Sequence, residues 1–91
     1  MTLTLEASYR LDEQVALRPE PFGALAYHYG TRRLSLLKSR TLLAVLQSLA
    51  GQPSGREACR AAGVGPGELV AYEEALATLA ESGMICERAA R

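Results

Sequence analysis

The sequence predicts an α+β fold: a three-stranded antiparallel sheet followed by three helices, with a helix-turn-helix-like helical part. Two observations lead to this class. Strand-like runs fall in the first 37 residues, where ALAYHYGTRRLSLL (24–37) places two apolar stretches around Gly30-Thr31. From residue 39 onward, apolar residues recur at helical spacing between stop signals. With 91 residues, we expect a single small domain, 1–91, with a thin core.

The stretch 24–37 predicts a hairpin with Gly30 and Thr31 as the central residues of a type II′ turn, Gly30 having a positive φ. Counting outward from the turn pairs Tyr27 with Leu34 and Leu25 with Leu36. Side chains alternate between the faces of a strand, so the bulky residues share one face, which we expect to lie on the core. That bulky set is Leu25, Tyr27, Tyr29, Leu34 and Leu36, and the lighter set is Ala24, Ala26, His28, Arg33, Ser35 and Leu37.

The segments before the hairpin are less well specified. Residues 1–12 alternate weakly and predict a loose arm or an edge strand. Residues 15–18 form a short extended piece, after which Pro19 and Pro21 exclude helix and interrupt a strand ladder. In a three-stranded meander, RRLSLL (32–37) is the last strand and therefore an edge. This edge is either open or covered by the N-terminal arm.

Three helices are predicted after residue 38. Ser39 is a good N-cap for a Leu-rich helix that ends before Gly51 and Pro53. A short helix follows over residues 55–62, with Ala58, Cys59 and Ala62 turned inward. Pro66 lies near the start of a third helix over 68–82, Gly83 stops it, and Met84-Ile85 fold back before a charged tail at 86–91. The apolar stripe of the third helix is Leu69, Tyr72, Leu76 and Leu79.

Composition and charge argue against several classes of function. Lys+Arg and Asp+Glu both number 10, so the chain lacks the basic footprint of non-specific nucleic-acid binding. The third helix carries Glu68, Glu73, Glu74 and Glu81 and no Lys or Arg, which argues against a recognition helix in DNA. Two cysteines, the lack of a signal-peptide pattern and the lack of a long apolar run predict a cytoplasmic protein that does not contact membranes.

No set of residues predicts catalysis. His28 is the only histidine and has no nucleophile-elbow motif beside it, so we read it as a surface or strand residue. Cys59, Cys86 and His28 do not have the spacing of zinc ligands, and the cysteines suit small buried positions. GVGPG (63–67) lacks the preceding strand and the GK[ST] ending of a phosphate loop. We therefore predict no enzyme, no metal and no cofactor.

The remaining feature is the edge strand itself. An open edge presents unpaired N–H and C=O groups to which a peptide can add as a further strand. Arg32 and Arg33 either protect this edge from aggregation or attract an acidic peptide. Two other classes stay open: a helix-turn-helix DNA-binding regulator, and a module that forms a homodimer through the same edge.

The stretch VALRPEPFGALAYHYGTRRLSLLKS (15–39), the Leu-rich helix after it and AAGV (61–64) resemble the mycofactocin system chaperone family. The resemblance runs over about residues 9–85 and is densest at RPEPFGAL, YHYGTRRLS and LLKS. In its order of elements the chain also resembles the pyrroloquinoline quinone biosynthesis protein D group, the RiPP recognition elements.

This resemblance implies a winged helix-turn-helix-like fold of three strands and three helices. It also implies a chaperone that captures a ribosomally synthesised precursor peptide and delivers it to a radical S-adenosylmethionine maturase. It further implies that the peptide adds to the third strand, in a cleft beside the third helix. The helix positions that face the peptide stay open, because the same stripe reads equally well as core. The implied peptide-binding residues are Arg32, Arg33, Leu34, Ser35, Leu36 and Leu37 on the strand, and Leu69, Val70, Tyr72, Glu73, Leu76 and Ala77 on the helix.

Overall fold

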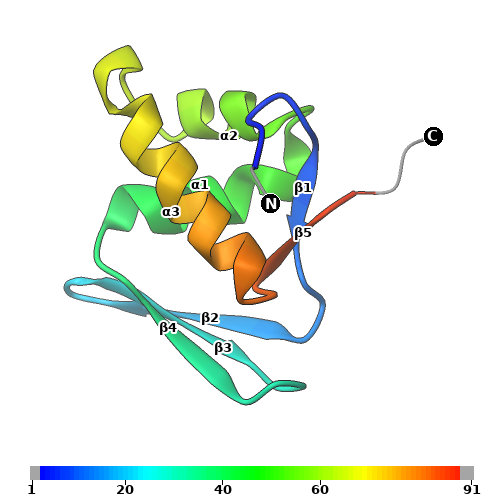
Figure 1. Cartoon of the computed structure of the whole chain (residues 1–91). Helices are drawn as coiled ribbons and strands as arrows, with labels where there is room; N and C mark the ends of the chain where they lie inside the picture. Colours follow the sequence, from blue (N-terminus) through cyan, green and yellow to red (C-terminus); the bar gives the residue numbers. More distant parts are fainter. Residues whose placement is uncertain (1–2, 89–91) are drawn as a thin grey trace.

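The computed structural model describes residues 3–88 and has the predicted α+β class. Three antiparallel strands precede three helices, and a second, two-stranded sheet joins the two ends of the described chain (Figure 1). The strands are β1 (Tyr9–Leu11), β2 (Val15–Glu20), β3 (Gly23–His28), β4 (Arg33–Leu37) and β5 (Ile85–Glu87). The helices are α1 (Arg40–Ser48), α2 (Gly55–Ala61) and α3 (Leu69–Glu81), with 3-10 turns η1 (Leu49–Gly51) and η2 (Pro66–Glu68).

The larger sheet has the strand order β2-β3-β4, with the predicted register between the last two strands. Tyr27 is opposite Leu34, and Leu25 is opposite Leu36. The expectation that Pro19 interrupts the ladder is wrong, because β2 continues through Pro19 to Glu20. The reason is that β2 is itself an edge strand, where a residue without an N–H is tolerated.

The turn between β3 and β4 differs from the predicted type II′ turn. His28 pairs with Arg33, so the loop has four residues, and the positive φ of 61° falls on Arg32 and not on Gly30. The Arg32 N–H donates to the His28 carbonyl at 2.8 Å. The His28 side chain decides this geometry: its Nδ1 accepts the N–H groups of Gly30 at 3.0 Å and Thr31 at 3.1 Å.

The face of the hairpin that packs on the core is the opposite of the one expected. Ala24, Ala26 and Leu37 are buried, whereas Leu34 and Leu36 are 59% and 57% exposed. All three helices lie on one side of the sheet (Figure 1). The Leu-rich helix α1 already fills the volume over this side, so small alanine side chains let the helix approach, and bulky ones would overpack it.

Gly23 is required where the sheet meets the start of α1. Its φ is 148°, and a Cβ placed there would lie 2.0 Å from the Leu37 carbonyl oxygen and 2.7 Å from the Ser39 nitrogen. No side chain fits in this space. The close approach fixes the β2–β3 turn against the end of β4.

The helix boundaries follow the predicted signals. The Ser39 hydroxyl accepts the Leu42 N–H at 3.1 Å and so caps α1. Gly83 has a φ of 79°, and the Met84 N–H donates to the Leu79 carbonyl at 2.9 Å, which is a Schellman motif that confirms the predicted stop. Ala58 and Cys59 of α2 are buried as predicted, and Ala62 is half-buried.

The N-terminal segment is packed and does not form a loose arm. Leu3, Leu5 and Tyr9 are buried, and β1 pairs antiparallel with β5, which contains the first two residues of the predicted tail. Residues 3–12 therefore lie on the helical layer and leave the edge of β4 uncovered. Residues 1–2 of the predicted arm and 89–91 of the predicted tail lie outside the described residues. Across residues 3–88, none of the helices has the length and hydropathy to cross a membrane.

Candidate functional site

The most suggestive feature of the structure is the open edge of β4. This strand pairs with β3 on one side, and within residues 3–88 no strand pairs with its other side. Every second residue of an edge strand directs its N–H and C=O groups away from the sheet. The edge therefore offers a row of backbone donors and acceptors to another extended chain.

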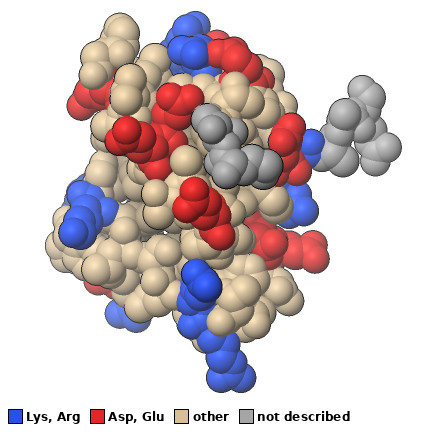
Figure 2. Space-filling view, in the orientation of Figure 1, with Lys and Arg blue, Asp and Glu red and all other residues tan. Residues whose placement is uncertain are grey.

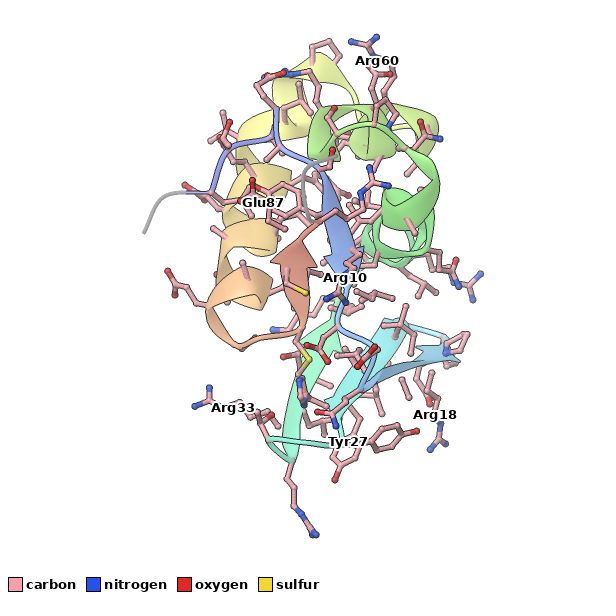
Figure 3. The ribbon with its side chains drawn as sticks, turned by 90° about the vertical axis from the view of Figure 1, so that its right-hand side faces the viewer. Arg10, Arg18, Tyr27, Arg33, Arg60 and Glu87 are labelled. Carbon is pink, nitrogen blue, oxygen red and sulfur yellow. The ribbon has the colours of Figure 1, made fainter. Side chains whose placement is uncertain are left out.

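The side chains predicted on this strand divide between the two faces and the core. Leu34 and Leu36 project from the exposed face, away from the helices. Leu37 is 1% exposed and belongs to the core, whereas Ser35 is half-buried beside it. Arg33 is exposed and extends on the side of the sheet where α3 lies (Figure 3).

Helix α3 is tied to the C-terminal end of β4 by one polar contact. The Tyr72 hydroxyl lies 3.4 Å from the Ser39 hydroxyl, and Ser39 is also the N-cap of α1. Of the predicted helix residues, Leu76 is fully buried and Val70 is 67% exposed. Leu69, Tyr72, Glu73 and Ala77 are half-buried. Leu76 and Leu37 therefore hold the helix and strand in place, and the other predicted residues retain accessible surface.

The charges of the strand and the helix have opposite signs. Arg32 and Arg33 lie in the turn and at the start of β4, and Lys38 directly follows β4. Helix α3 carries Glu73, Glu74 and Glu81. Figure 2 shows acidic side chains over α3 and basic side chains along the sheet below it. Among the ion pairs within residues 3–88, none involves Arg32, Arg33 or Lys38.

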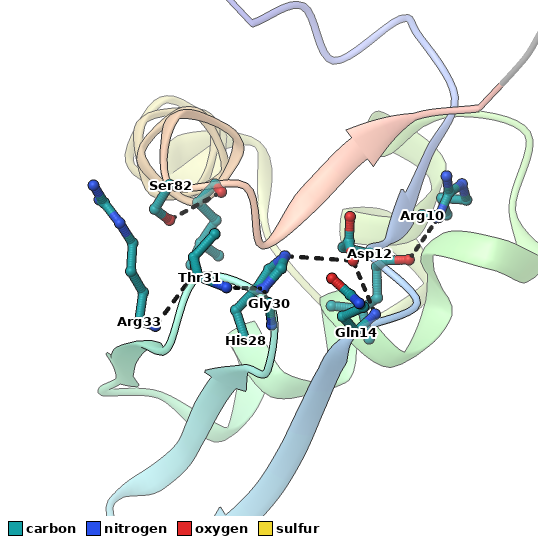
Figure 4. Close-up of polar contacts among 10 residues, drawn as sticks. Arg10, Asp12, Gln14, His28, Gly30, Thr31, Arg33 and Ser82 are labelled. Carbon is teal, nitrogen blue, oxygen red and sulfur yellow. Dashed lines mark hydrogen bonds and ion pairs between the residues drawn. The ribbon is translucent and has the colours of Figure 1, made fainter.

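His28 anchors the start of β4 through contacts that the sequence did not reveal. While its Nδ1 accepts the turn amides, its Nε2 lies 3.4 Å from an Asp12 carboxylate oxygen, which also accepts the Gln14 N–H at 2.8 Å (Figure 4). The Asp12 N–H in turn donates to the Met84 carbonyl at 2.9 Å. This buried histidine thus links the β3–β4 turn to the end of β1 and the start of β5.

A separate pocket lies away from the β4 edge. Its volume is about 340 Å³, and it contains only Ala77 of the predicted set. Burial raises the pKa of the Tyr9 phenol, whose hydroxyl donates to the Thr4 carbonyl in this region. Burial also raises the pKa of the Cys59 thiol, which lies in α2. The pocket is lined by Leu3, Thr4, Tyr9, Ala77, Ala80, Glu81, Ile85, Cys86 and Glu87.

The described part of the chain holds no cluster of three or more His, Cys, Asp or Glu residues arranged for a metal ion. A free sheet edge beside a helix, with accessible apolar and basic side chains, is the arrangement used by domains that bind extended peptides. The class defined by the fold and the edge is therefore a small peptide-binding domain.

Comparison with known proteins identifies the family. The sequence pattern of the peptide chaperone MftB family matches residues 8–86, and the chain belongs to this family. It is 59% identical over 80 residues to a peptide chaperone MftB of Mycobacterium ulcerans (strain Agy99), covering 88% of this chain and 73% of the relative. It is 55% identical over 83 residues to that of Mycobacterium tuberculosis (strain ATCC 25618 / H37Rv), covering 91% and 76%.

A third relative, the peptide chaperone MftB of Mycolicibacterium smegmatis (strain ATCC 700084 / mc(2)155), is 51% identical over 85 residues, covering 93% of this chain and 83% of the relative. No solved structure matches the chain. Membership in a family of chaperones confirms both the predicted resemblance and the prediction that the chain is not an enzyme.

Proposed function

We propose that this chain is the peptide chaperone of mycofactocin biosynthesis, that it binds a ribosomally synthesised precursor peptide by strand addition to β4, and that it presents the peptide to a radical S-adenosylmethionine maturase. The observation that carries the proposal is the free edge of β4, left uncovered by an N-terminal segment that packs elsewhere. Family membership supports the chaperone role.

Strand addition accounts for the division of the predicted residues. Main-chain hydrogen bonds to β4 provide affinity that tolerates many sequences. Specificity then comes from side chains that keep accessible surface beside the edge. Arg32 and Arg33, at the start of β4, favour acidic residues on the peptide. The buried pair Leu37 and Leu76 support the site from within the core.

The first experiment is an amide NMR titration of labelled protein with the precursor peptide encoded beside it. We expect shifts concentrated at residues 32–37 and 69–77. Shifts clustered instead around the pocket at β1 and β5 would place the peptide elsewhere. A spectrum unchanged by saturating peptide would overturn peptide binding by the isolated chain.

The mode of binding needs its own test, because side-chain contacts alone also produce shifts. A series of peptides in which single amides are replaced by esters removes one N–H at a time. Strand addition predicts that affinity falls at every second position across the bound segment, since alternate amides face β4. Equal affinity along the whole series would exclude strand addition while leaving peptide binding intact.

A further inference from the structure

The outer sheet face is the side of the β2-β3-β4 sheet that points away from the helices. The Tyr27 and Tyr29 rings pack edge to face at 5.4 Å and so lie on the same side. Arg18 and Tyr27 project together from the lower side of the molecule (Figure 3). By the strand register and the contact of the two rings, this face consists of Ala16, Arg18, Glu20, Leu25, Tyr27, Tyr29, Leu34 and Leu36.

This face concentrates the exposed apolar surface of the described chain. Within residues 3–88, the large hydrophobic side chains that are exposed are Phe22, Tyr29, Leu34, Leu36 and Val70, and three of these five lie on the outer sheet face. Phe22 lies in the β2–β3 turn at the end of the same sheet. The sequence placed Tyr29, Leu34 and Leu36 on the core, and the structure leaves them in solvent.

The size of the patch argues against a second copy of the chain as its occupant. Its exposed apolar side chains add up to on the order of 500 Å², within the size range of the largest apolar patch on a typical monomeric protein, which is often functional. A stable complex buries about 800 Å² on each partner. The exposed apolar side chains of this face therefore supply only part of the area that a stable dimer buries, and the face suits a partner that gains additional contacts elsewhere.

Strand addition would provide those contacts. A peptide on the free edge of β4 lies about 4.8 Å from it, and its alternate side chains fall on the same face as Leu34 and Leu36. The sheet would then continue across the peptide, with the outer sheet face bordered by the alternate side chains of the peptide. A protein seated on this face would touch the chaperone and its cargo together.

The charges at the rim indicate the chemistry of that partner. Arg18 is partly neutralised by Glu20 at 2.7 Å, whereas Arg32 and Lys38 are exposed at the two ends of β4 and form no ion pair with other described residues. Charge complementarity therefore requires an apolar patch bordered by acidic side chains.

We propose that the outer sheet face docks the enzyme that modifies the bound peptide, through an apolar patch of that enzyme bordered by acidic side chains. This inference rests on the proposed function and deepens it, because the maturase would recognise the chaperone and the added peptide strand as one continuous sheet.

The test uses the double variant Tyr27→Thr with Tyr29→Thr, which removes the aromatic surface and keeps residues that suit a strand. Neither tyrosine belongs to the proposed peptide edge. Binding of the full-length chain to the purified maturase and, separately, to the precursor peptide is measured by calorimetry. We expect affinity for the maturase to fall at least tenfold and affinity for the peptide to stay within twofold.

The matched control is Val70→Thr, which replaces an exposed apolar side chain of α3 that lies off the outer sheet face. It should leave maturase binding unchanged and weaken only peptide binding. The single variant Tyr29→Thr, outside the strands, covers the case in which the double variant does not fold.

Each remaining outcome is decisive. A folded tyrosine variant that binds the maturase with wild-type affinity would overturn the docking proposal. So would light scattering that shows a dimer for the wild-type chain and a monomer for the variant, because the face would then be a contact between copies. A wild-type chain that binds the maturase but not the peptide would contradict the proposed function and leave the docking face supported.

Discussion

The Nδ1 atom of His28 lies 3.0 Å from the backbone nitrogen of Gly30 and accepts its N–H. A side chain from the end of β3 thereby shapes the turn that leads into β4, the edge proposed to receive the peptide. The stability of this edge depends on a buried histidine that takes no part in chemistry.

Replacing His28 tests this dependence. His28→Ala leaves the turn amides of Gly30 and Thr31 without their acceptor and opens a small cavity, so we expect a loss of about 2 kcal/mol in the free energy of unfolding. His28→Asn places an amide oxygen near the position of Nδ1 and should recover about 1 kcal/mol. Urea denaturation measures both, and equal stability of the two variants would contradict the role of the acceptor.

The positive φ of Arg32 predicts a contrast between two neighbouring arginines. Arg32→Gly relieves a left-handed conformation of 61° and should raise the free energy of unfolding by up to about 1 kcal/mol. Arg33→Gly lies in a strand and should lower it by about 0.5–1 kcal/mol. Thermal denaturation of the two variants checks the sign of each change in stability. If Arg33→Gly were the more stable variant, the four-residue loop would be contradicted and the two-residue turn expected from the sequence would be favoured.

Gly23 should tolerate no side chain. Gly23→Ala drives a Cβ into the Leu37 carbonyl and strains the backbone, so we expect at least about 2 kcal/mol of destabilisation by chemical denaturation. Gly67→Ala is the control, because a Cβ there meets nothing within 4 Å. It should change stability by less than about 1 kcal/mol. Comparable losses in both variants would show that the sheet does not approach the start of α1 as described.

Charge reversal tests the basic end of the edge. Arg32→Glu with Arg33→Glu should weaken binding of the precursor peptide by tenfold or more and reduce the dependence of its affinity on salt. Arg10→Glu with Arg60→Glu changes the net charge equally at exposed positions on β1 and α2. Titrations at low and high salt compare the two pairs. Unchanged affinity in the first pair would exclude a steering role for Arg32 and Arg33.

The two cysteines should react very differently with a thiol reagent. Cys59 is fully buried and its pKa is raised, so its thiolate fraction at pH 8 is lower than that of a free thiol, whereas Cys86 is half-buried. We expect one thiol to react in the native protein and a second only on unfolding. Cys86→Ser should abolish the native reaction, and a persistent reaction would show that Cys59 is accessible.

The Cys59 thiol makes the free energy of unfolding depend on pH in the alkaline range. The pKa of Cys59 in the folded protein lies above its ordinary value of 9.0, so the folded state is favoured below that pH and loses this advantage as the pH rises through the folded pKa. Burial also raises the pKa of the Tyr9 phenol, so this group likewise lowers the stability of the folded state as the pH rises above its ordinary pKa of 10.0.

Local signals predicted much of this fold. Ser39 caps α1, Gly83 stops α3, and the pairing of Tyr27 with Leu34 follows from alternation around a turn, because each feature depends on residues close in sequence. The edge position of β4 was predicted because this strand is the last one before the helices. These predictions needed no knowledge of what packs against what.

Three features were decided by contacts between distant segments. The turn took its shape from the His28 ring, which Asp12 and the chain near Met84 hold in place. The N-terminal segment found a partner in β5, more than 70 residues away, and so left β4 free. The third feature is the buried face of the sheet: the alternation of side chains defines two faces of a strand, but it does not determine which face the helices cover.

The sequence by itself therefore determined the class of fold, the family, the strand register and the edge position of β4. The tertiary structure decided which face of the sheet is buried, because α1 fills the space above Ala24 and Ala26 and leaves no volume for Leu34 or Leu36. The outer sheet face, whose bulky residues the sequence assigned to the core, is therefore exposed to solvent. Its exposure follows from the close packing of α1 on the opposite face of the sheet.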